Sequence, residues 1–184
     1  ALEPEIREPI VIETWEANHP LPMKDGMPAS RASYNTAASF RVRCRLDDGA
    51  VIEIRDSAQD LGFDNGLLFE CEGGRYFVNR GKLTGKPAEQ LADDPLPTEQ
   101  LESLRKGRPV MNHLANFYWC CCERSEPISD VRSHLRSLDI CHLCNISLRL
   151  GRTLRWDPAN EVLLDDDDAA RWLRRQQRAG FKVI

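Results

Sequence analysis

The sequence lacks a dinucleotide-binding fingerprint. Nowhere does an apolar strand run into the pattern G-x-G-x-x-G with an acidic residue about 20 positions later, although backbone amides need such glycines to approach a pyrophosphate. The clustered glycines, Gly73-Gly74 and Gly81 with Gly85, stand between short alternating segments and are explained by hairpin turns. The sequence therefore predicts no cofactor-binding residues. Because it also starts at Ala1 rather than at a methionine, we expect a fragment of a longer protein.

Long apolar runs and an excess of basic residues are also missing. No apolar run approaches the roughly 18 residues of a transmembrane helix, and the first residues, with Glu3, Glu5 and Glu8, lack the basic and apolar regions of a signal peptide. The formal net charge is -4, with both signs mixed along most of the chain, so no basic face for a nucleic acid is predicted. We expect a soluble cytoplasmic chain whose partners include neither membranes nor nucleic acids.

A complete set of metal-binding cysteines is missing as well. Cys141-His142-Leu143-Cys144 has the C-x-x-C spacing of half a zinc site, but no second C-x-x-C supplies further ligands. The chain has seven cysteines, an odd number, and Cys120, Cys121 and Cys122 are consecutive, which suits a helix lining a core better than a disulfide framework. We therefore predict reduced cysteines, a C-x-x-C pair buried within a helix, and no metal.

The first half of the chain contains the pattern of a β-sheet. Residues 10–12 open a strand, and residues 40–46 alternate apolar side chains with arginines, as expected for a strand with one solvated face. A turn at Asp47-Asp48-Gly49 leads to a second strand at residues 51–55, and another hairpin covers residues 67–78. Because tight turns join these strands, we expect them to be antiparallel.

A long polar loop is predicted between the first strand and the first hairpin. Residues 18–28 contain three prolines and a glycine, which argue against regular structure there. Loops of this length are either functional or disordered. This one carries His19 and Lys24, which become candidate ligand-binding residues.

Helical patterns begin in the second half of the chain, at Thr98. A short helix is predicted to open there, and a longer one to run from about Pro109 to about Arg124. One side of the longer helix carries an apolar stripe, formed by Met111, Leu114, Phe117 and Cys121.

The strongest predicted helix begins after Asp130, which is expected to cap it. This helix extends to about Leu150 and ends at Gly151. Its apolar residues are spread around most of its circumference, so we expect it to be buried on two sides, between the sheet and a neighbouring helix. Residues 154–156 and 162–164 then read as strands that flank a turn.

Three polar patterns each have two interpretations. The run Asp165 to Asp168 could suggest calcium, but it lacks the spaced ligands and the glycine of a binding loop, and acidic residues favour a helix start, which we predict here. Asp130 and His134 lie four apart, so they form either an acid-base pair or a helix cap beside a surface histidine. Residues 77–82, with Arg80, either hold a carboxylate, phosphate or sugar hydroxyl or form a solvated turn.

Several short stretches follow a known pattern in the right order along nearly the whole chain. They include ANHPLP at residues 17–22 and LGRTLRWDP at residues 150–158, and the others are residues 34–36, 77–82, 112–117, 127–131, 141–146 and 166–169. On these residues the chain resembles the C-terminal domain of the glucose-fructose oxidoreductase and inositol dehydrogenase family, in a subgroup of predicted NADH-dependent dehydrogenases.

This resemblance implies an α+β domain whose open, largely antiparallel sheet has helices packed on one face. Residues 1–184 would form a single C-terminal domain, and a Rossmann domain that binds NAD or NADP would lie elsewhere in the parent protein. The parent would move a hydride between this cofactor and a carbon that bears a hydroxyl, in a sugar, a polyol or a related compound. The C-terminal domain would close one side of the substrate pocket and form a homo-oligomer through its sheet.

The chain departs from the family pattern in the catalytic residues. The E-K-P motif is absent, because Gly85-Lys86-Pro87 differs in its first residue and in its position, and Asp130 with His134 follows the sheet, where the family places such a pair before it. We therefore assign no catalytic residue and expect this chain alone to be inactive, with no cofactor bound. The side chains predicted to bind substrate are His19, Lys24, Asn35 and Arg80.

Two other interpretations stay open. The chain could be a truncated relative that dimerises through its sheet and serves as a non-catalytic scaffold or a sugar-binding module. A zinc-stabilised module is a more distant alternative.

Overall fold

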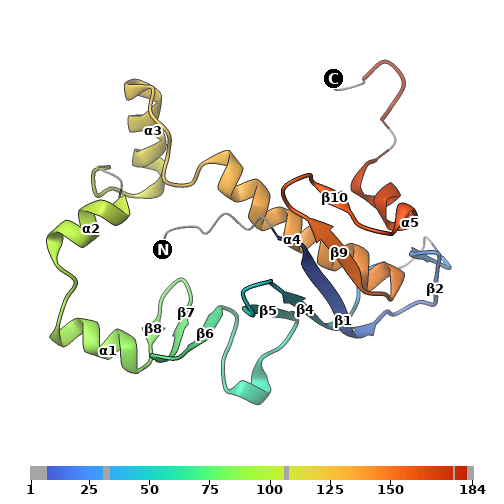
Figure 1. Ribbon diagram of the computed structural model, residues 1–184, viewed down its shortest axis with the longest axis horizontal. Coiled ribbons are helices and arrows are strands. Elements are labelled where there is room, and N and C mark those ends of the chain that lie inside the picture. The colour runs from blue at the N-terminus through green and yellow to red at the C-terminus, as the bar shows by residue number, and fades with distance from the viewer. Residues whose placement is uncertain (1–7, 31–33, 106–107, 176, 182–184) are drawn as a thin grey trace. The chain divides into compact units, whose positions relative to one another are not determined.

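The computed structural model describes residues 8–30, 34–105, 108–175 and 177–181. These residues divide into two compact units. Unit 1 contains Ser57–Leu135, and unit 2 contains the described residues up to Asp56 together with those from Arg136 onward. Both units combine helices with antiparallel strands, which confirms the predicted α+β class (Figure 1). The assignment of residues 1–184 to one domain stays a prediction. No helix of the described residues is long and apolar enough to cross a membrane.

Unit 2 is built on a five-stranded antiparallel sheet with the strand order β10-β9-β1-β4-β5. Because β1 pairs with both β4 and β9, segments from both halves of the chain share this sheet. The predicted strands at residues 40–55 and on either side of the turn after residue 156 are confirmed. The strands are β1 (Ile10–Asn18), β4 (Ser39–Arg45), β5 (Val51–Arg55), β9 (Leu154–Asp157) and β10 (Val162–Leu163).

The segment predicted as a long loop contains a short hairpin, so that prediction was wrong for its second part. β2 (Met23–Lys24) pairs with β3 (Met27–Pro28) around a two-residue turn. Asp25 and Gly26 have φ angles of 49° and 75°. Positive φ at both central residues is the type I′ geometry that Asp-Gly sequences favour in two-residue hairpins, which explains why the chain turns here.

One face of the unit 2 sheet packs against the second half of α4 (Val131–Leu150), which crosses the sheet in Figure 1. The helix begins where predicted, since the Asp130 carboxylate accepts hydrogen bonds from the backbone N–H groups of Arg132 and Ser133 at 2.8 and 3.0 Å. The core contains Ile10, Ile12, Val42, Cys44, Leu143, Cys144, Ile146, Leu148, Leu154, Trp156, Leu163 and Ala169.

Among the described residues, burial of α4 is limited to this second half, on its side that faces the sheet; the expected second buried side, against a neighbouring helix, stays a prediction. Leu135 and Leu138 are 50% and 49% exposed, whereas Leu143 is 1% exposed. The apolar pattern identifies side chains that can be buried, but burial also requires a neighbouring element.

Two polar contacts connect α4 to the sheet inside the core. The hydroxyl of Ser147, which is fully buried, lies 2.8 Å from Oγ1 of Thr14 and donates a hydrogen bond to the carbonyl of Arg152 at 2.8 Å. The Sγ atoms of Cys44 and Cys144 are 3.5 Å apart, and both residues are free thiols. The contact with Cys44 and burial raise the pKa of Cys144 well above its ordinary value, so this group remains a thiol.

The acidic run at the C-terminal end begins the last helix, as predicted. Asp166 caps α5 (Asp167–Ala170) by accepting a hydrogen bond from the backbone N–H of Ala169 at 2.9 Å. A short 3-10 helix, η2 (Arg171–Leu173), follows directly. This places several arginines next to the end of α5.

Unit 1 contains a three-stranded antiparallel sheet with the order β6-β7-β8, and its predicted hairpin over residues 67–78 is confirmed. Phe77 is 4% exposed, and its ring stacks on Phe63 at 4.7 Å. A helix that the sequence did not predict, α1 (Lys86–Asp93), packs against β7 and β8. The other elements here are η1 (Gln59–Leu61), β6 (Leu67–Cys71), β7 (Gly74–Val78) and β8 (Leu83–Thr84).

Two further helices belong to unit 1. The predicted short helix is α2 (Thr98–Arg105). The longer one, α3 (His113–Glu123), begins later than predicted because Asn112 caps it, accepting a hydrogen bond from the backbone N–H of Ala115 at 2.8 Å.

The apolar stripe predicted on α3 is not buried. Leu114 and Phe117 are 67% and 57% exposed, and Cys121 is also exposed. The buried residues of α3 are Asn116 and Cys120. The prediction that the cysteine triplet lines a core therefore holds only for Cys120.

Candidate functional site

A cavity with a volume of about 1030 Å³ lies at one end of the unit 2 sheet. Three groups of elements form its wall: the end of β1 with the β2-β3 hairpin, the C-terminal turn of α4, and the segment from α5 onward. Its lining residues are Ala17, His19, Met23, Asp25, Gly26, Leu148, Arg149, Leu150, Gly151, Arg152, Asp168, Arg171, Trp172, Arg174 and Arg175. The volume is at the upper end of the range typical of small-molecule sites.

His19 is the one sequence-predicted residue that lines this cavity. Its Nε2 lies 3.2 Å from the backbone carbonyl of Leu148. Because a carbonyl can only accept, Nε2 must carry a proton, which leaves Nδ1 as an acceptor when the ring is neutral. Nδ1 is buried and has no hydrogen-bond partner among the described residues. Buried polar atoms are rarely left without a hydrogen bond, so this nitrogen is an exception to the usual pattern.

Positive charge dominates the lining, although two arginines are neutralised. Arg152 forms a two-pronged ion pair with Asp166, with N to O distances of 2.8 and 2.6 Å, and Arg171 pairs with Asp168. Arg149 instead donates from Nη1 to the carbonyl of Gly26 at 3.3 Å. The cavity therefore keeps unneutralised positive charge, which the sequence analysis did not predict.

The other predicted ligand-binding residues do not line this cavity. Lys24 lies in β2 and is exposed, and Asn35 is exposed in the segment that precedes β4. Arg80 belongs to unit 1, where it lines a smaller pocket of about 650 Å³ between the ends of β6 and β7. The role of each in binding a ligand stays a prediction.

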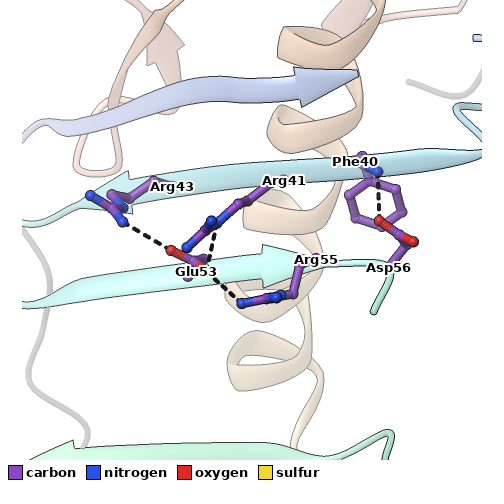
Figure 2. A network of polar contacts seen from close by, with 6 residues as sticks. All are labelled: Phe40, Arg41, Arg43, Glu53, Arg55 and Asp56. Atoms are coloured by element: carbon purple, nitrogen blue, oxygen red, sulfur yellow. Dashed lines mark hydrogen bonds and ion pairs between the residues drawn. The ribbon is translucent and has the colours of Figure 1, made fainter. Parts of the chain in front are cut away.

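A second cluster of charge lies on the sheet face of unit 2 that α4 does not cover. Glu53 on β5 accepts from three arginines: Arg41 Nε at 2.9 Å, Arg43 Nη2 at 3.0 Å and Arg55 Nη1 at 3.3 Å (Figure 2). The guanidinium of Arg43 also lies 3.4 Å from the centre of the Trp15 ring. The arginines that the sequence placed on a solvated face are therefore held in an ion-pair network.

Replacing Glu53 with Gln is expected to lower the free energy of unfolding by about 1–2 kcal/mol at pH 7, because three guanidiniums lose their shared carboxylate. Partial burial opposes ionisation, but the hydrogen bonds and charges of Arg41 and Arg43 outweigh it and lower the pKa of Glu53. Its stabilising effect is therefore complete above the unfolded pKa, near 4.5, and is lost as the pH falls through the lower folded pKa.

Urea unfolding of both proteins between pH 7 and pH 3 measures this difference. We expect the two curves to converge at the acidic end. Glu70→Gln is the matched control, because Glu70 is largely exposed and pairs with one arginine, Arg75, at 3.4 Å. An equal loss in both variants, or a loss independent of pH, would contradict the network.

Two sequence motifs remain: Asp130 with His134, and the C-x-x-C pair Cys141 and Cys144. Both oxygens of Asp130 accept hydrogen bonds from the first turn of α4, which lowers the pKa of this carboxyl to about 2. His134 contacts Asp130 through its backbone N–H, which donates to the Asp130 carbonyl at 3.2 Å. These contacts agree with the interpretation of Asp130 as a helix cap.

In the C-x-x-C pair Cys144 is buried but Cys141 is exposed, so the predicted burial of both was half right. In the described part of the chain, no cluster of three or more His, Cys, Asp or Glu could hold a metal.

A nicotinamide cofactor does not fit at Gly85, the glycine that joins strand β8 to helix α1. Gly85 lies between β8 and α1, and its carbonyl accepts from the backbone N–H groups of Ala88 and Glu89. A Cβ added to Gly85 would collide with the carbonyl oxygen of Arg75. This glycine thus permits close packing of the chain on itself, which leaves no room for a pyrophosphate at its Cα.

Comparison with protein-family models, with curated proteins and with solved structures gave no match.

Proposed function

We propose that this chain is the substrate-side and assembly domain of an NAD- or NADP-dependent oxidoreductase that acts on a sugar, a polyol or a related hydroxy compound. The cofactor would bind to a separate Rossmann domain of the parent protein, a proposal supported by the missing G-x-G-x-x-G pattern and by the close packing at Gly85. The ordered sequence resemblance supports this proposal, and the α+β class and the open antiparallel sheet agree with it.

The observation that carries the proposal is the exposed apolar surface of α3 in unit 1. Leu114, Phe117 and Tyr118 follow the three- and four-residue spacing of one helical face, and all are more than half exposed. Exposed apolar clusters of this kind mark interaction sites. A neighbouring domain of the same polypeptide would bury this face and supply the catalytic residues that we do not find here.

The role in assembly is proposed for the outer face of the unit 2 sheet. Trp15 on the central strand β1 is 48% exposed on this face, and Val51 and Val162 on the two edge strands, β5 and β10, are 52% and 43% exposed. A stable contact between two copies buries about 800 Å² on each of them, and aromatic side chains with arginine are enriched in such contacts. The carboxylates of Glu13 and Glu53 offset part of the arginine charge on this face.

Light scattering after size exclusion should give twice the 21.0 kDa mass of one chain, and titration with NADH and NADPH should give no saturable fluorescence change. Trp15→Glu is expected to shift the chain to a monomer, because it places a charge in the centre of the contact. Leu138→Glu, which changes an equally exposed residue of α4, should leave the mass unchanged.

A monomeric native chain would exclude the assembly role. Saturable NADH binding at micromolar concentration would exclude the proposal that cofactor binding belongs to another domain. A dimer that binds neither nucleotide but binds an uncharged sugar would favour the alternative, a non-catalytic sugar-binding scaffold.

A further inference from the structure

The cavity beside His19 contains more positive charge than its own acidic residues neutralise. Arg152 and Arg171 are paired with Asp166 and Asp168. In the part of the chain that the structure describes, the other three arginines of the wall have no carboxylate partner, and the only further acid in the lining is Asp25. The unpaired arginines are Arg149, Arg174 and Arg175.

Of these three, Arg149 is the one held in place by contacts with other described residues. It stands in the last turn of α4, its Nη1 is held by the carbonyl of Gly26 at 3.3 Å, and its Cζ lies 5.8 Å from the centre of the Trp172 ring. A guanidinium has five N–H donors in a fixed plane, and only one is used in this contact. The remaining donors are positioned for the two parallel hydrogen bonds that a carboxylate or phosphate accepts.

His19 adds a second polar group to the same cavity wall. With Nε2 held by the Leu148 carbonyl and Nδ1 buried, the ring is fixed in the wall beside the arginines. Apolar wall residues, Met23, Leu150 and Trp172, surround these groups. A cavity of this composition combines charge recognition with space for the carbon frame of a small molecule.

We propose that this cavity binds a small molecule that carries a carboxylate or phosphate group, with Arg149 as the main contact of the oxyanion. Arg174 and Arg175 add to the positive field, and the imidazole of His19 forms part of the cavity wall beside them. The identification of this ligand as the substrate rests on the proposed function. The anion site itself is argued from the cavity.

Isothermal titration calorimetry with the full chain tests this proposal. The probes are gluconate, which carries a carboxylate, glucose 6-phosphate, which carries a phosphate, and glucose as the uncharged counterpart. We expect at least one charged probe to bind ten times more tightly than glucose, and binding to weaken when the salt is raised, because screening reduces the attraction. Which charged probe binds distinguishes a carboxylate ligand from a phosphate ligand.

The decisive variant is Arg149→Met, which keeps the apolar stem of the side chain and removes its charge. We expect a loss of affinity of tenfold or more. Arg132→Met, an exposed arginine at the other end of the same helix, is the matched control and should bind normally. The double variant Arg174→Met with Arg175→Met repeats the test if circular dichroism shows that Arg149→Met is unfolded.

Three results would overturn the anion site. The first is equal affinity for glucose and the charged probes, and the second is no heat of binding from any probe at concentrations on the order of 10 mM. The third is unchanged affinity in the arginine variants. A monomeric chain that binds gluconate would contradict the proposed assembly role and leave this inference standing. A dimer that binds none of the three probes would contradict this inference and leave the proposed assembly role standing.

Discussion

Gly26→Ala is expected to lower the free energy of unfolding by about 2–4 kcal/mol, through two effects that act at one atom. The first is the φ angle of 75°, since a left-handed conformation costs a residue with a Cβ about 1 kcal/mol. The second is space: the new Cβ would lie 2.5 Å from Cζ2 of Trp172 and 3.1 Å from Cδ2 of Leu150. Overpacking of this kind costs roughly 1–3 kcal/mol.

The same variant should also reduce binding in the cavity. Gly26 holds Arg149 through its carbonyl, and Trp172 lies against that guanidinium. When Trp172 moves away from the new methyl group, the arginine loses one of its two supports. We expect weaker binding of gluconate or glucose 6-phosphate by calorimetry, along with the lower midpoint in urea.

Gly49→Ala is the control that separates the two effects. Gly49 has a similar φ of 85°, but a Cβ there would meet no atom within 4 Å. It should cost only the conformational part, about 1 kcal/mol, with no change in binding. If both variants lower the free energy of unfolding equally, then the clash between the new Cβ at position 26 and Trp172 costs no stability.

Gly85→Ala is expected to have the largest effect in unit 1, about 4 kcal/mol. Gly85 has φ 119° and ψ 157°, a region that is nearly exclusive to glycine and costs other residues about 1–3 kcal/mol. A Cβ would also collide with the Arg75 carbonyl and lie 2.8 Å from Cα of Tyr76. These are backbone atoms of β7, so no side-chain rotation relieves the clash, and α1 must separate from the sheet.

Far-ultraviolet circular dichroism during urea unfolding measures this loss, together with Gly81→Ala as control. Gly81 lies nearby, in the β7-β8 connection; its φ is not positive, and its Cβ would point into open space. Its replacement should be nearly neutral. A Gly85→Ala protein as stable as the Gly81→Ala protein would show that α1 does not depend on this close approach.

Local signals in the sequence predicted much of the fold correctly. Alternation of arginines with apolar residues located β4, the Asp130 cap and Gly151 bounded α4, and the aspartates before Ala169 located α5. Each of these features depends on neighbouring residues in the chain, so it can be read directly. Asp25-Gly26 was equally readable as a type I′ hairpin, but the surrounding prolines favoured a loop.

The candidate site was harder to predict because distant segments build it. His19 was recognised, but Arg149 is 130 positions further along the chain, and the arginines after η2 carry no local sign of a cavity. The network at Glu53 depended on strand register, which pairs Arg43 with Glu53 and Arg41 with Arg55. The predicted apolar stripe of α3 is present but exposed in unit 1, since periodicity does not specify a packing partner.

The division of the chain has a consequence for the order of folding during synthesis. Strands β1, β4 and β5 leave the ribosome first, but the half of α4 that covers their apolar face, and strand β9 beside β1, are made only after all of unit 1. Contacts between such distant segments form slowly. The nascent sheet must therefore wait uncovered while about 80 residues are added, at a rate on the order of ten per second. We expect chaperones to bind nascent chains in that interval, and aggregation to begin there when they do not.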